Sequence, residues 1–75
     1  MRLNFDIEGN AVMDMEYFVK VANKELANAI FDCLAEYAFR NQKEIIPFII
    51  EENTAREIID LGIQAYMKKQ SEVDE

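Results

Sequence analysis

The sequence predicts an α+β fold in which an N-terminal β-hairpin packs on two or three amphipathic helices. Residues 2–21 alternate apolar and polar side chains on both sides of a Gly-Asn pair, and this period of two is typical of half-buried strands. From Asn23 onward the apolar residues recur every three or four positions, which is the spacing of a helix face. With only 75 residues, the chain is expected to form one small domain over residues 1–70, followed by a frayed acidic tail at 71–75.

The register of the hairpin follows from keeping its apolar residues on one face. A two-residue loop at Gly9-Asn10 would place Phe5 opposite Asp14 and mix the two faces. A three-residue loop, Gly9 to Ala11, pairs apolar residues with one another: Ile7 with Met13, Phe5 with Met15, and Leu3 with Tyr17. The rival interpretation, a helix from Ala11 onward, scatters charged and apolar residues around its axis. We therefore predict a second strand that continues to Val21.

Two helices are predicted after the hairpin. Asn23 is suited to cap the first helix, which should end near Arg40-Asn41 and carry a favourable pair between Glu36 and Arg40. The spacing Thr54-x-x-Glu57 is a capping-box pattern and predicts the start of the last helix, which should end at about Gln70.

The segment 44–52 is apolar around Pro47 and leaves two alternatives open. A short helix starting at about Ile46 would tolerate the proline in its first turn, and an edge strand would tolerate it as well. The cap-like spacing of Asn41 and Glu44 favours the helix.

Composition excludes several classes of function. Fifteen acidic residues against eight basic ones give a net charge of −7, which disfavours direct binding to nucleic acid and to anionic membranes. No apolar run approaches the roughly 20 residues of a membrane span, and the start of the chain does not have the pattern of a signal peptide. A single cysteine, Cys33, favours a reducing compartment, so we expect a cytoplasmic protein.

Catalysis is not expected, and no residue is assigned a catalytic role. The chain has no histidine; Ser71 lies in the tail, Thr54 is better explained as a cap, and Cys33 lies on an apolar helix face among acids. No glycine-rich phosphate loop and no cofactor motif occur. The carboxylates of the hairpin fit no established metal-binding loop, so we predict a solvated acidic face and no metal.

The outer face of the hairpin is the predicted partner-binding site. In the chosen register the face carries an exposed aromatic ring among carboxylates: Asp6, Glu8, Asp14, Glu16 and Phe18. The predicted function is a non-catalytic interaction module that docks on a basic, nucleic-acid-handling protein, as small acidic inhibitors from phages and mobile elements do by imitating phosphates. In the alternative interpretation Phe18 packs under a helix and the acids only keep the strand edge soluble.

A second set of residues is predicted to pack helices or to form a homodimer: Gly62, Ile58, Tyr66 and Phe48. Gly62 falls on the buried face of the last helix, where the absence of a side chain lets another helix approach, first of all the chain's own helix around Ala29 and Cys33. The apolar run that contains Phe48 gives a further alternative, a structural subunit with this run as its interface.

The stretch TAREIIDLGIQAYMKK resembles the last helix of ribbon-helix-helix repressors. The resemblance covers that helix alone and implies a small DNA-binding regulator as another alternative. In that family a basic or polar strand enters the DNA groove, whereas the strand here offers Arg2, Asn4 and Asp6 and is followed by a second strand.

Overall fold

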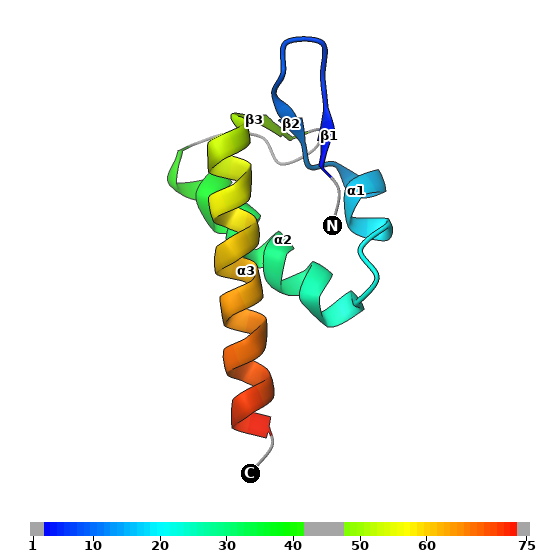
Figure 1. Ribbon diagram of the computed structural model, residues 1–75. Helices are drawn as coiled ribbons and strands as arrows, with labels where there is room; N and C mark the ends of the chain where they lie inside the picture. Colours follow the sequence, from blue (N-terminus) through cyan, green and yellow to red (C-terminus); the bar gives the residue numbers. More distant parts are fainter. Residues whose placement is uncertain (1–2, 42–47, 74–75) are drawn as a thin grey trace.

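The computed structural model describes residues 3–41 and 48–73 and confirms an α+β fold with a small N-terminal hairpin and amphipathic helices. The elements follow one another as β1 (Asn4–Phe5), β2 (Ala11–Val12), α1 (Met15–Val19), α2 (Lys24–Arg40), β3 (Ile49–Ile50) and α3 (Glu52–Val73). The three strands form one antiparallel sheet at one end of the molecule, from which α3 extends as a long rod beside α2 (Figure 1).

The hairpin exists, but its predicted register was wrong. Asn4 lies opposite Val12 and Phe5 opposite Ala11, so the three-residue loop spans Ile7 to Gly9 and not Gly9 to Ala11. The carboxylate of Asp6 causes this shift, because it accepts hydrogen bonds from the backbone N–H of Glu8 at 3.0 Å and of Asn10 at 2.8 Å. Gly9 supplies the left-handed residue of the turn, with a φ of 85°. Ile7 therefore lies at the tip, where 98% of the residue's surface is exposed.

The second strand ends at Val12, so the predicted strand to Val21 was also wrong. The side chain of Asp14 accepts a hydrogen bond from the N–H of Tyr17 at 3.1 Å and caps α1. Met13, Tyr17 and Val21 nevertheless point inward as predicted. Residues four apart share a face in a strand and lie close together on a helix, so their burial is compatible with either structure.

Helix α2 agrees with the prediction at both ends. The Asn23 side chain accepts hydrogen bonds from the N–H groups of Glu25 and Leu26 at 2.9 and 3.1 Å, and the last helical residue is Arg40. The predicted ion pair between Glu36 and Arg40 is present.

The segment after α2 contains an edge strand where a helix was favoured. Ile49 and Ile50 pair with β2, and the N–H of Met13 donates to the Phe48 carbonyl at 2.9 Å, so the helix preference was wrong for these residues. Asn41 ends α2, where its side-chain amide donates to the Tyr37 carbonyl. The predictions for Glu44, Ile46 and Pro47 lie outside the described residues.

Helix α3 is longer than predicted. It begins at Glu52, so Thr54 is already inside the helix and does not cap it, and it continues three residues past Gln70 to Val73. The helix lies antiparallel to α2: Gln70 donates to Glu25 near one end of the pair, and Gly62 packs on Ile30 near its middle. Within the described ranges, no helix is both long and apolar enough to cross a membrane.

The core lies where the sheet, α1, α2 and α3 meet. Its larger members are Met13, Tyr17, Ile30, Leu34, Phe48, Ile50 and Ile58. One face of the sheet contributes Ala11 and Ile50 to this core, while Ile49 on the other face remains about half exposed.

Candidate interaction surface between α1 and α2

The five predicted partner-binding residues do not share one face. Asp6 and Glu8 lie in the hairpin turn, whereas Asp14, Glu16 and Phe18 belong to α1 or its cap. Three of the four carboxylates make local interactions: Asp6 holds the turn, Asp14 caps α1, and Glu16 forms an ion pair with Lys20 at 3.0 Å. The predicted row of carboxylates on one side of a hairpin is therefore absent.

Phe18 is partly buried against the core, which corrects the prediction that it is exposed. Its ring centroid lies 5.0 Å from that of Tyr17 and 5.4 Å from that of Phe31, and both contacts are edge-to-face. Phe18 thus joins α1 to α2, in agreement with the alternative in which this ring packs under a helix.

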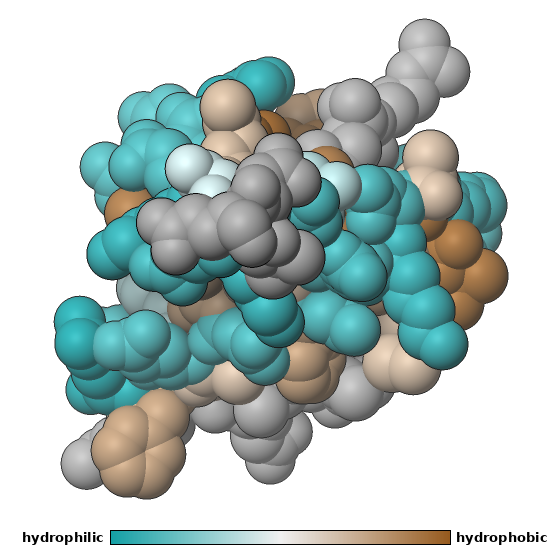
Figure 2. All heavy atoms as spheres, turned by 90° about the horizontal axis from the view of Figure 1, so that it is seen from below, coloured by the Kyte–Doolittle hydropathy of each residue, from teal (hydrophilic) through white to brown (hydrophobic). Residues whose placement is uncertain are grey.

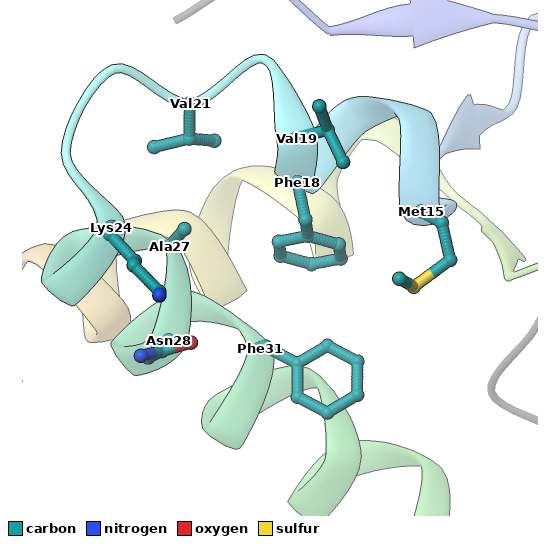
Figure 3. Close-up of a pocket in the computed structure, with 8 residues that line it drawn as sticks. All are labelled: Met15, Phe18, Val19, Val21, Lys24, Ala27, Asn28 and Phe31. Carbon is teal, nitrogen blue, oxygen red and sulfur yellow. The ribbon is translucent and has the colours of Figure 1, made fainter.

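Beside this aromatic contact a groove of about 550 Å³ opens between α1 and α2. Its walls are mostly apolar: Met15, Phe18, Val19, Val21, Lys24, Ala27, Asn28 and Phe31. Figure 3 shows the side chains of Met15 and Phe18 pointing from α1 toward α2 and Phe31. Met15 and Val19 are large apolar residues with 54% and 78% of their surfaces exposed.

The groove is one of several places where large apolar side chains are exposed. Seen from the end where α3 stops, the visible surface is mainly hydrophilic, and one of its hydrophobic patches lies at the edge on the side of α1 (Figure 2). Exposed Leu, Val, Met or Phe residues are common singly, but a group of them around a concavity is typical of interaction sites.

Sequence reasoning missed this groove because it depends on α1 being a helix. In a strand Met15 and Val19 would face the core with Met13, whereas in a helix they form a stripe with Phe18 at positions i, i+3 and i+4. This spacing was the feature of the sequence that could have predicted an apolar helix face at the groove. Phe31 was missed because it lies at the border of the apolar face of α2, next to Ile30.

An acidic region adjoins the groove on α2. Asn28 lines both the apolar groove and a smaller one between α2 and α3, and the smaller one carries three carboxylates, those of Glu25, Asp32 and Glu36. Two cations also lie in this region, because Lys69 lines the smaller groove and Arg40 pairs with Glu36.

The thiol of Cys33 lies at the same acidic region and is partly buried. Burial raises the pKa of Cys33, and the charges of Glu36 and Asp32 raise this pKa further. The thiol is therefore held in its protonated, weakly nucleophilic form at neutral pH. Across the described ranges, no three His, Cys, Asp or Glu side chains form a group that could hold a metal ion.

The four residues predicted for packing or dimerisation all make contacts within the chain. Ile58 and Phe48 are buried in the core, and Phe48 contacts the Tyr37 ring edge-to-face. Gly62 packs on Ile30, next to the predicted Ala29, and the Tyr66 hydroxyl accepts a hydrogen bond from the Asn23 side chain at 2.8 Å.

Comparison with known proteins adds no assignment. No protein-family model matches the chain, and no curated protein or solved structure shows significant similarity to it.

Proposed function

We propose that this protein is a non-catalytic protein-binding module whose binding surface is the groove between α1 and α2. The observation that carries the proposal is the exposure of two apolar side chains, Met15 and Val19, at a mostly apolar concavity. Burying one such side chain contributes about 1.5–3 kcal/mol, so a partner that covers both gains a useful part of its binding energy there. Methionine also adapts its shape to different apolar partners.

The charge of the chain supports a basic partner. A net charge of −7 attracts positively charged proteins over several ångströms and speeds their encounter, more strongly at low salt. Imitation of phosphates by carboxylates is not part of this proposal, because Asp6 and Glu8 lie in the hairpin turn whereas Asp14 and Glu16 belong to α1 or its cap. A single, protonated thiol suits a reducing compartment such as the cytoplasm.

The lining of the groove favours binding over catalysis. Its polar members are Lys24 and Asn28, which do not make a nucleophile and base pair. The apolar residues instead provide the shape and desolvation that a protein side chain requires.

Photo-crosslinking in cells tests the proposal. A photoreactive amino acid replaces Val19 in the groove or, as the control, Gln64, which is exposed on α3. We expect a discrete protein adduct from position 19 and none from position 64. The same adducts from both positions, or none from position 19, would contradict the proposal.

A further inference from the structure

We propose that the occupant of the groove is a basic amphipathic helix of a partner protein. Its apolar face would lie between α1 and α2, and its lysine or arginine side chains would face the carboxylates of α2. This inference rests on the proposed function, since it requires that the groove binds protein.

The apolar part of the argument comes from the length of the groove. On α2 the lining residues run from Lys24 to Phe31, which corresponds to about two helical turns, or roughly 10 Å. Two turns accommodate apolar side chains spaced one turn apart, as on the apolar face of a helix. Grooves of this kind, lined by methionine and phenylalanine, commonly bind such helices.

The charged part comes from the acids beside the groove. Residues 14–36 contain five acids, Asp14, Glu16, Glu25, Asp32 and Glu36, and two bases, Lys20 and Lys24. Lys20 is held by Glu16, and Arg40 by Glu36. Lys24 lines the groove at the end away from Asp32, and Lys69 lies across the smaller groove. Among the described residues Asp32 makes no ion pair. A lysine or arginine that follows an apolar stripe in the groove would therefore meet Asp32 across Asn28, and the charges would be complementary.

The same charges disfavour the other occupants. An acidic helix would place like charges beside Asp32, and a second copy of this chain would bring a further net charge of −7. A helix suits the site better than an extended segment because apolar and charged rows lie side by side on a helix, as they do on α2 itself.

Three synthetic peptides provide the test. The first is a helical peptide with leucine on one face and lysine on the other; the second replaces lysine with glutamate, and the third replaces leucine with serine. Each is titrated into the isotope-labelled full chain and followed by NMR. We expect the leucine–lysine peptide to shift the signals of Met15, Val19 and Phe31, and each of the other peptides to bind at least about tenfold more weakly.

A pair of charge reversals separates local recognition from general attraction. Asp32→Lys lies beside the groove, and Asp60→Lys makes the same change of net charge at an exposed position of α3. We expect Asp32→Lys and Val19→Asp each to weaken binding of the leucine–lysine peptide by about tenfold or more, and Asp60→Lys by less than about twofold.

The outcomes distinguish the two proposals. Equal effects of the two reversals, or binding of the glutamate peptide in the groove as tightly as the lysine peptide, would overturn the basic helix but leave the groove as a binding site. If no peptide shifts groove signals and position 19 gives no crosslink, the proposed function itself fails. A dimer that dissociates on Val19→Asp would identify a second copy as the occupant and contradict the inference.

Discussion

At Gly62, helices α2 and α3 approach so closely that even a methyl group does not fit. A Cβ added there would lie 2.6 Å from Cγ1 and 2.7 Å from Cα of Ile30. A rotation of the Ile30 side chain relieves only the first contact, because the second is with the backbone. The closest part of the α2–α3 contact therefore depends on this residue.

We predict that Gly62→Ala destabilises the protein by about 1–3 kcal/mol, because overpacking outweighs the better helix propensity of alanine. Urea unfolding followed by circular dichroism measures the change. Gln64→Ala, at an exposed position of the same helix, should change stability by less than about 0.5 kcal/mol. A stabilising Gly62→Ala would show that the helices do not meet as described.

Two side chains with raised pKa values, the buried Tyr17 and the partly buried Cys33, affect stability at alkaline pH. Burial raises the pKa of Tyr17, and burial together with Glu36 and Asp32 raises the pKa of Cys33. Above about pH 8.5 the unfolded chain releases these protons before the folded chain does, so the unfolded state binds fewer protons and stability falls as pH rises.

We therefore expect the free energy of unfolding to decrease between about pH 8.5 and 11, and this contribution to be absent at neutral pH. Tyr17→Phe and Cys33→Ser should each make the decrease shallower. Unfolding curves measured across this pH range provide the test, and slopes unchanged by both substitutions would contradict it.

At the scale of elements, Asn23 links the start of α2 to α3. Its side-chain oxygen caps α2, while its amide donates to the Tyr66 hydroxyl at 2.8 Å. We expect Asn23→Ala to cost about 1–2 kcal/mol, since it removes both interactions. Tyr66→Phe removes only the second and should cost less. Equal losses in urea unfolding would mean that the cap contributes nothing.

Helix α1 has only five residues, too few to be stable alone, so its cap matters for the groove. Asp14→Ala should lower stability by about 0.5–2 kcal/mol and reduce the helical NMR chemical shifts of Met15–Val19. Asp14→Asn retains a capping oxygen and should stay close to wild type in both measurements. Helical shifts that survive Asp14→Ala would show that packing of Phe18 alone holds α1.

The elements differ in how well the sequence predicts them. Helix α2 was predicted at both ends because cap, periodicity and ion pair agree. Residues 13–21 were mispredicted because the spacing of Met13, Tyr17 and Val21 suits a strand and a helix equally. Contacts in the folded chain decide between them. The ring of Phe18 packs against that of Phe31, and the side chain of Asp14 accepts a hydrogen bond from the N–H of Tyr17.

At the scale of the whole molecule, the fold class was predictable because the alternation up to Val12 and the helical spacing after Asn23 are both local information. The candidate site was not, because it is formed by side chains on two helices whose separation depends on the core beneath them. The burial of Met13 and Tyr17 was predicted correctly, but the exposure of Met15 and Val19 was not. A strand would bury these two side chains, whereas the helix exposes them.

The structure of residues 13–21 is thus the central claim, and solution NMR of the full chain tests it most directly. We expect helical chemical shifts for Met15–Val19 and nuclear Overhauser contacts between the rings of Phe18 and Phe31. Extended chemical shifts over the same residues, with contacts between Phe5 and Met15, would restore the hairpin register rejected above. That result would remove the groove on which both proposals rest.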